Sequence, residues 1–174
     1  VMQCMRETKI IMTGNKGKYF LLMLSFVGWT FLAILPSVFL PIPSGILGKV
    51  QPTQEQIDDV NYGYWLAKET GKLDIGQSVV IKDKMIMAVE AIEGTDKCIK
   101  RGCKIAKKNS RVIKVAKPSQ DKRFDIPAIG LRTLKTLHKY KGDLIAVEAG
   151  ETIIVDREDV IKYANKHNIV IMAV

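Results

Sequence analysis

The strongest constraint on the fold is the alternation of short apolar runs with helical patterns through residues 77–174. The runs at 144–148 and 169–174 are almost wholly apolar, which is typical of strands that are buried on both faces of a sheet. Helical segments of about ten to fifteen residues separate the runs, as in strands connected by helices. The sequence therefore predicts an α/β fold: a single mixed-sheet domain with helices packed on the sheet, preceded by an apolar N-terminal segment.

Local signals place the individual elements. Thr53 and Gln56 have the spacing of a capping box, which predicts the start of a helix within 52–72. Two strands joined by a tight turn at 82–84 are expected within 77–94. Further helices are expected within 94–109, 130–142 and 157–168, with Thr95 and Asp156 as N-caps, and further strands within 111–117, 143–150, 151–156 and 169–174.

Charge and composition narrow the classes of partner. The formal net charge of +9 favours an anionic partner, such as a phosphorylated metabolite, a nucleic acid or a membrane surface. Aromatic residues make up 7% of the chain and do not alternate with basic runs, so binding of single-stranded nucleic acid is disfavoured. The three cysteines offer no disulfide framework and suit a reducing cytoplasm, and the two histidines have no partner at metal-ligand spacing.

The N-terminal part is unlike the rest. Residues 19–40 contain no charged side chain and follow Lys16 and Lys18, so they are long enough to cross a bilayer. Gly28 and Pro36 interrupt this stretch, which favours a buried segment or a linker over a membrane span. We therefore expect an atypical apolar segment or linker over 1–50 and a globular domain over 51–174.

Charged residues and two polar ones that a simple surface position does not explain fall in three places. Each place follows or interrupts a predicted strand, and in α/β sheets the loops beyond the carboxyl ends of strands form the ligand crevice. The residues are Glu90, Glu93, Thr95 and Asp96; Lys114, Lys117, Gln120, Asp121, Arg123 and Asp125; and Glu148. Carboxylates beside lysine and arginine suit phosphoryl chemistry, because acids can hold Mg²⁺ or Mn²⁺ while cations offset charge on phosphate oxygens.

Plainer explanations stand beside this one. Asp96 can be only a favourable charge in the first turn of a helix, and Asp121 and Arg123 can simply pair with each other. Glu148 interrupts an apolar strand, so it either pairs with a lysine or faces the site. The sequence has no Walker-type glycine loop, no G-x-G-x-x-G after a strand and no G-x-S-x-G elbow. These absences exclude a familiar nucleotide kinase, a Rossmann dehydrogenase and a serine hydrolase.

Several segments together carry a family resemblance. They read "LDIGQSVVIKD", "AVEAIEGTD", "KVAKPSQDKRFDIPAIG", "AVEAGETIIVDRE" and "IVIMAV". In this order they resemble the C-terminal domain of the UDP-2,3-diacylglucosamine pyrophosphatase of lipid A biosynthesis, in the form unrelated to the calcineurin-like enzyme. The resemblance implies hydrolysis of UDP-2,3-diacylglucosamine to UMP and 2,3-diacylglucosamine 1-phosphate, with water attacking the α-phosphorus and Mg²⁺ or Mn²⁺ required.

The resemblance also implies roles for particular residues. Asp121, with Asp125 as the second choice, is expected to orient water or bind metal, and Arg123 to assist catalysis. The full expected metal set is Asp121, Asp125, Glu93 and Asp96, and the expected substrate-binding set is Gln77, Thr95, Lys114, Lys117, Gln120 and Glu148. The implied setting is the cytoplasm, peripheral to the inner membrane, as a homodimer with no nucleic-acid partner.

One departure from the family pattern leaves alternatives open. Family members have a Rossmann-like domain before this one, and here "TGNKGKYFLL" and "GWTFLAILPSVFLPIPSGILG" only faintly resemble its opening and its linker. The leading hypothesis is a metal-dependent pyrophosphatase domain. The alternatives are a truncated, catalytically idle remnant that binds a UDP-lipid sugar or a partner chain, and a basic module that binds membranes or nucleic acid.

Overall fold

The computed structural model describes residue 24, residues 45–118 and residues 126–174. Residues 41–174 belong to one compact unit, whose elements follow in chain order. They are β1 (Gly45–Leu47), α3 (Gln54–Lys72), β2 (Ser78–Lys82), β3 (Met85–Val89), α4 (Thr95–Ala106), β4 (Arg111–Lys114), β5 (Ala128–Ile129), α5 (Leu131–Lys139), β6 (Leu144–Val147), β7 (Ile153–Ile154), α6 (Arg157–Lys166) and β8 (Val170–Ala173). The predicted α/β class is confirmed.

The main sheet is mixed and has the strand order β1-β8-β6-β4-β2-β3. Strands β4, β6 and β8 are parallel, whereas β1 pairs antiparallel with β8 and β2 pairs antiparallel with β4. Strand β3 is antiparallel to β2 and so runs in the direction of β4. The carboxyl ends of β3, β4, β6 and β8 therefore lie at one edge of the sheet, which we call the carboxyl edge.

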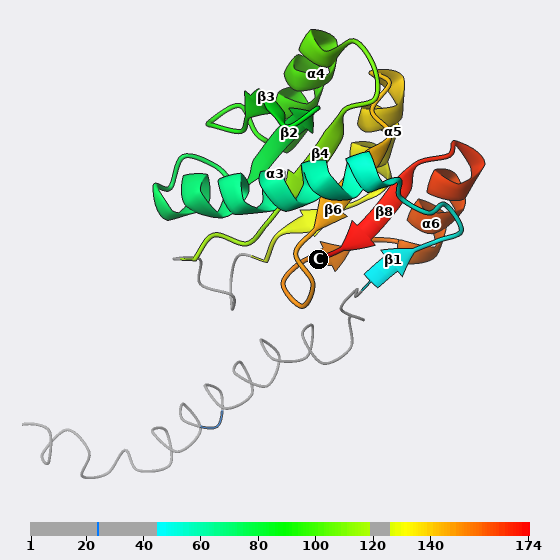
Figure 1. Ribbon diagram of the computed structural model, residues 1–174. Helices are drawn as coiled ribbons and strands as arrows, with labels where there is room; N and C mark the ends of the chain where they lie inside the picture. The colour runs from blue at the N-terminus through cyan, green and yellow to red at the C-terminus, as the bar shows by residue number, and fades with distance from the viewer. Residues whose placement is uncertain (1–23, 25–44, 119–125) are drawn as a thin grey trace, which may run out of the picture. The chain divides into compact units, whose positions relative to one another are not determined.

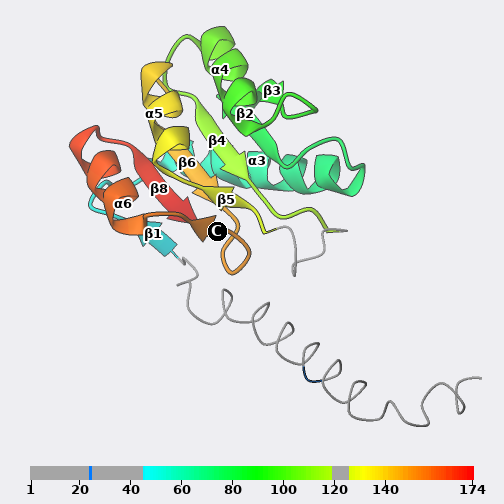
Figure 2. The same cartoon turned by 180° about the vertical axis from the view of Figure 1, so that it is seen from behind.

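Helices cover both faces of this sheet. Helix α3 lies across one face (Figure 1), where Val60 and Ala67 pack on Ile81, Ile113 and other buried strand residues. Helices α4, α5 and α6 lie on the other face (Figure 2), where a second core joins Ile99, Leu134 and Val160 to the sheet. Two apolar cores on the two faces explain why the central strands are almost continuous apolar runs.

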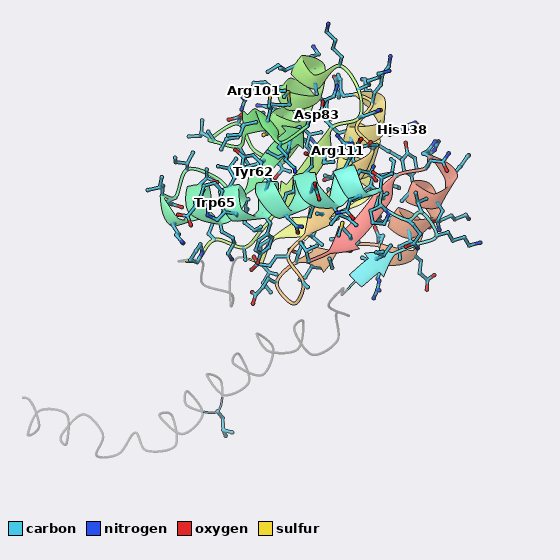
Figure 3. The ribbon with its side chains drawn as sticks, viewed as in Figure 1. Tyr62, Trp65, Asp83, Arg101, Arg111 and His138 are labelled. Atoms are coloured by element: carbon cyan, nitrogen blue, oxygen red, sulfur yellow. The ribbon has the colours of Figure 1, made fainter. Side chains whose placement is uncertain are left out.

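Most local predictions are confirmed. The capping box of α3 is present, with the Thr53 hydroxyl accepting from the Gln56 backbone N–H and the Gln56 side chain accepting from the Thr53 N–H. Strands β2 and β3 form the expected hairpin, and the stripe of α4 that includes Ile99, Gly102 and Cys103 is buried. In α5, Leu134 and Leu137 are buried, whereas His138, labelled in Figure 3, is exposed. Its Nδ1 lies 3.0 Å from the Tyr163 hydroxyl.

Other features differ from the sequence-based expectation. Thr95 is wrong as an N-cap, because Gly94 occupies that position and α4 has no side-chain cap. Asp156 does occupy the N-cap of α6, but in a left-handed conformation and without a side-chain hydrogen bond. The predicted strand at 151–156 is the short β7, which pairs with β5 in a separate two-stranded sheet. The sheet also contains β1, which lies before residue 51, the expected start of the domain.

Within the described part of the chain, no helix is both long and apolar enough to cross a bilayer. Apart from Leu24, the charge-free stretch 19–40 lies outside the described residues.

Candidate functional site

The predicted polar residues gather at the carboxyl edge of the sheet. Glu90 directly follows β3, Lys114 ends β4, and Glu148 directly follows β6. The loop before β2 reaches the same edge, because β2 runs in the opposite direction to these strands. The topology thus brings together side chains that are far apart in the sequence, at the edge where α/β folds bind ligands.

The alternation of side chains along the strands divides these residues between the two faces of the sheet. Ser78 is paired with Lys114 in the sheet register, and the Glu90 N–H donates to the Ser78 carbonyl oxygen at 2.8 Å. These three side chains share the face covered by α4, because the residues two positions further into each strand belong to the core on that side. Glu148 instead faces α3.

The first group, which we call the β3–α4 cluster, consists of Ser78, Glu90, Thr95 and Lys114. The Thr95 hydroxyl donates to Glu90 Oε1 at 2.9 Å and accepts from Lys114 Nζ at 3.1 Å. Lys114 Nζ also donates to the carbonyl oxygen of Ala128 at 3.0 Å. Glu90 and Lys114 are each only 7% exposed, so one hydroxyl links a buried carboxylate to a buried ammonium group.

The backbone around this cluster is tightly packed. A Cβ atom placed on Gly76 would lie 2.1 Å from the carbonyl oxygen of Glu90, so this position requires glycine. Gly94 has a φ of +82° and makes the turn from β3 into α4. The loop therefore brings the first turn of α4 against Glu90, and Gly94 at the N-cap supplies no side-chain cap to this turn.

The two carboxylates next to this cluster are held by arginines. Glu93 forms an ion pair with Arg101, and the Arg101 hydrogen bond is the main reason that the Glu93 pKa is lowered. Asp96 Oδ2 lies 2.8 Å from Arg132 Nε, and Asp96 Oδ1 accepts from the Thr133 hydroxyl. Among the described residues, no three histidine, cysteine, aspartate or glutamate side chains are grouped as a metal site would require.

The second group, which we call the α3–β6 cluster, is built around Glu148. Glu148 Oε1 accepts from Lys68 Nζ at 2.8 Å and from the Tyr64 hydroxyl at 3.0 Å. Glu148 Oε2 accepts from Lys68 Nζ at 3.0 Å and from the Ala116 N–H at 2.8 Å. Burial alone would raise the pKa of Glu148, but the hydrogen bonds from Lys68, Ala116 and Tyr64 hold it below its ordinary value. The same surroundings raise the pKa of Tyr64 to about 12, through burial first and the Glu148 carboxylate second.

The α3–β6 cluster decides between the two roles expected for Glu148, pairing with a lysine or facing the site. The residue is paired with a lysine, and its oxygens are occupied by groups of the protein itself. It joins α3 to the ends of β4 and β6, which places it as a support behind the carboxyl edge. Sequence reasoning missed Tyr64 and Lys68 as its partners, although their spacing of four residues puts both on one face of α3.

Two further predicted residues have different surroundings. Lys117 Nζ forms an ion pair with Asp74 Oδ1 at 2.7 Å, which joins the end of α3 to the segment after β4. Gln77 is half-buried, and its Oε1 has no hydrogen-bond partner among the described residues. Because Gln77 precedes Ser78, the alternation along β2 places it on the α3 side of the sheet, away from the β3–α4 cluster.

The remaining predicted residues lie outside the described part of the chain. They are Gln120, Asp121, Arg123 and Asp125. Their roles in catalysis, metal binding and substrate binding stay predictions. The described residues on either side, Pro118 and Ile126, belong to the segment that connects β4 to β5.

Comparison with known proteins bears on the same region. Residues 43–172 match the family model of the LpxI C-terminal domain. The chain is also 36% identical over 141 residues to the UDP-2,3-diacylglucosamine pyrophosphatase LpxI of Caulobacter vibrioides. That alignment covers 76% of this chain and 50% of the relative, so the chain spans about half the length of the curated relative that it matches.

Proposed function

Because this chain belongs to the LpxI C-terminal domain family, we propose that it acts in the hydrolysis of UDP-2,3-diacylglucosamine in lipid A biosynthesis. The products would be UMP and 2,3-diacylglucosamine 1-phosphate, with water attacking the α-phosphorus. The observations that carry the proposal are the likeness to a relative named for this reaction and the family match over residues 43–172, which include the residues of the carboxyl edge.

The electrostatics of the carboxyl edge support a role in phosphoryl chemistry. Lys114 and Lys117 bring two ammonium groups to the end of β4, and Lys114 is fixed by Thr95 and by the Ala128 carbonyl oxygen. Positive charge held rigidly in a partly buried site stabilises the negative charge that develops on phosphate oxygens. Following the sequence, Asp121 is the first candidate to orient the attacking water and Asp125 the second, with Arg123 and Gln120 beside them.

Mg²⁺ or Mn²⁺ remains part of the proposal as a requirement to be tested. The described candidates do not fit a metal site as they stand, because Glu93 and Asp96 are each paired with an arginine. Asp121 and Asp125 lie outside the described residues, so we assign no catalytic step to a metal. A chelator in the assay tests the requirement directly.

The expected setting is the cytoplasm, at the surface of the inner membrane, where a lipid-linked sugar is found. Three apolar side chains at the carboxyl edge support contact with a lipid surface: Leu73 and Ile75 in the loop after α3, and Ile92 in the loop before α4. All three are exposed, and Ile92 fully so. The homodimer implied by the family resemblance also stays a prediction.

The proposal is tested by UMP release from UDP-2,3-diacylglucosamine by the whole chain, with Mn²⁺ or Mg²⁺ present. We expect release to fall by about 100-fold or more in Asp121→Ala, since loss of a group that acts on the reacting centre costs at least this much. Asp159→Ala, which removes an exposed carboxylate of α6, serves as the matched control.

The outcomes separate the hypotheses. Release that neither Asp121→Ala nor Asp125→Ala lowers would contradict the assigned roles, and release that persists with EDTA would contradict the metal requirement. Substrate that binds without being cleaved would reject hydrolysis by this chain and support the alternative of a catalytically idle binding domain.

A further inference from the structure

Glu90 is a buried carboxylate that the protein only half satisfies. Its Oε1 accepts from the Thr95 hydroxyl at 2.9 Å, whereas its Oε2 is buried and has no hydrogen-bond partner among the described residues. Glu90 is only 7% exposed, and it forms no direct ion pair within the described ranges. Buried carboxylates normally have every oxygen hydrogen-bonded, so the open acceptor of Glu90 indicates a missing donor.

The surroundings of Oε2 restrict what that donor belongs to. The Thr95 hydroxyl that holds Oε1 is in the first residue of α4, so the carboxylate lies against the N-terminus of a 12-residue helix. The same hydroxyl accepts from Lys114 Nζ, which places a positive charge one hydroxyl away. A helix N-terminus and a buried ammonium group favour an anion, and phosphate is the anion that such sites commonly bind.

A phosphate group alone does not suit this arrangement. Glu90 would repel it, and its fully ionised oxygens offer no donor to Oε2. A ligand that carries a hydroxyl or an amide N–H close to its phosphate meets both demands, because the phosphate faces the positive charge while the donor meets the carboxylate. Phosphorylated amino sugars have this combination of groups.

We propose that Glu90 is a ligand-binding residue that accepts, through Oε2, a hydrogen bond from a hydroxyl or amide N–H of a phosphorylated amino sugar. The inference rests on the proposed function for the identity of that sugar, which is the glucosamine part of the lipid substrate. Glu90 then decides between a sugar phosphate and a simple phosphate ester, and Thr95 is a positioning residue that orients both Glu90 and Lys114.

The test is calorimetric titration of the whole chain at pH 8 with N-acetylglucosamine 1-phosphate and, separately, with methyl phosphate, which has no donor in its dianionic form. We expect the sugar phosphate to bind more tightly. In Glu90→Gln its affinity should fall by about 10-fold or more, because a hydrogen bond to a charged group is lost. The affinity for methyl phosphate should stay the same or rise.

Two variants guard the interpretation. Glu69→Gln makes the same chemical change at a surface position of α3, where Glu69 pairs with Lys72, and should leave both affinities unchanged. Glu90→Asp keeps the charge but shortens the side chain, so it should retain part of the preference for the sugar phosphate even if Glu90→Gln fails to fold.

Each other outcome overturns the inference. Equal loss of both ligands in Glu90→Gln, no loss of either, or no preference for the sugar phosphate in the unaltered chain would mean that Oε2 does not meet the sugar. Titration with Mn²⁺ alone supplies a further arm, since a cation affinity that Glu90→Gln abolishes would assign the open oxygen to a metal.

Failure of this inference can be told apart from failure of the proposed function. Glu90-dependent binding of the sugar phosphate without UMP release would retain the binding residue and reject hydrolysis. UMP release that Glu90→Gln leaves unchanged would retain hydrolysis and reject the residue.

Discussion

The two ends of the parallel strands handle buried charge in opposite ways. At the amino ends, Arg111 is surrounded by three carboxylates of the protein: Asp59, Asp83 and Asp143. At the carboxyl ends, Glu90 has an oxygen for which the described residues supply no donor. The amino ends, which we call the closed end, pair their buried charges with opposite charges of the protein, although Asp143 Oδ1 has no hydrogen-bond partner within the described ranges. Glu90, at the carboxyl ends, forms no ion pair with the described residues and has an open acceptor.

The closed end joins elements that are distant in the sequence. Arg111 Nη1 lies 3.0 Å from Asp59 Oδ2 and 3.8 Å from Asp83 Oδ1, and its Nε lies 3.5 Å from Asp143 Oδ1. Figure 3 shows Arg111 and Asp83 close together beside α3. Arg111 Nε and Nη1 have no hydrogen-bond partner within the described ranges, so these contacts are ion pairs. Burial raises the pKa of Asp143 despite the nearby guanidinium.

Asp59 adds aligned hydrogen bonds to this end. Its oxygens accept from the backbone N–H groups of Asp83 and Lys84 at 3.0 and 2.7 Å, which fastens the β2–β3 turn to α3. Buried charges that are matched within the protein serve its conformation, whereas an unmatched buried acceptor lowers stability. The difference between the ends therefore assigns a structural role to the amino ends and supports the proposal that the carboxyl ends bind a ligand.

The largest expected loss of stability follows from removing the Arg111 charge at the closed end. Arg111→Met leaves Asp59 buried at 3% side-chain exposure without a cation, and loss of one partner of a buried ion pair costs about 3–5 kcal/mol. Urea unfolding followed by circular dichroism measures the change. Arg132→Met, at a largely exposed arginine of α5, is the matched control and should change the free energy of unfolding by less than about 0.5 kcal/mol. Similar small losses in both variants would contradict a structural role for the closed end.

An intermediate effect is expected at the α3–β6 cluster, which is closed although it lies at the carboxyl edge. Glu148→Gln weakens the hydrogen bonds from Lys68, Tyr64 and Ala116, and should lower the free energy of unfolding at pH 7 by about 1–3 kcal/mol. Because the pKa of Glu148 is lowered in the folded state, its stabilising contribution is present above pH 4.5 and is lost as the pH falls through the folded-state pKa.

The pH dependence separates this role from a simple packing defect. The unaltered chain and Glu148→Gln should differ most near pH 7 and converge toward pH 3, in unfolding curves measured across that range. Glu158→Gln, at an exposed position of α6, controls for loss of one carboxylate. A difference that stays constant from pH 7 to pH 3 would assign the loss to side-chain shape instead of charge.

The smallest effect on stability is expected at Glu90. Glutamine can still accept from Thr95, and it removes a buried charge that is only half satisfied. The free energy of unfolding of Glu90→Gln should therefore stay within about 0.5 kcal/mol or rise slightly. Thermal and urea unfolding without ligand measure it. A loss as large as that of Arg111→Met would place Glu90 with the structural charges and remove the contrast between the two ends.

Local patterns predicted much of the fold. The capping box at Thr53, the hairpin within 77–94 and the apolar runs of β6 and β8 depend on contacts between near neighbours, so their signals are visible in short windows. The rule that ligands bind beyond the carboxyl ends of strands also placed Glu90, Lys114 and Glu148 at one edge.

The same patterns could not predict which of the side chains at the carboxyl edge share a face of the sheet, or which of them are paired. Gln77 and Thr95 are expected in one substrate-binding set, but the alternation of side chains puts Gln77 on the other side of the sheet. Glu93 stays a predicted metal ligand, and in the structure it forms an ion pair with Arg101, eight residues away, which no local pattern indicated. Short strands such as β1 and β5 were missed because two or three residues carry too little pattern to recognise.

The sequence by itself determined the fold class, the order of the main elements and the family, because these depend on periodicity and on motifs that are contiguous along the chain. Only the tertiary structure decided which charges are matched. Lys68 and Glu148 are 80 positions apart, and Arg111 at the start of β4 pairs with Asp59 of α3. A carboxylate becomes a support or a binding group according to the donors that folding brings to it, and no local pattern specifies those donors.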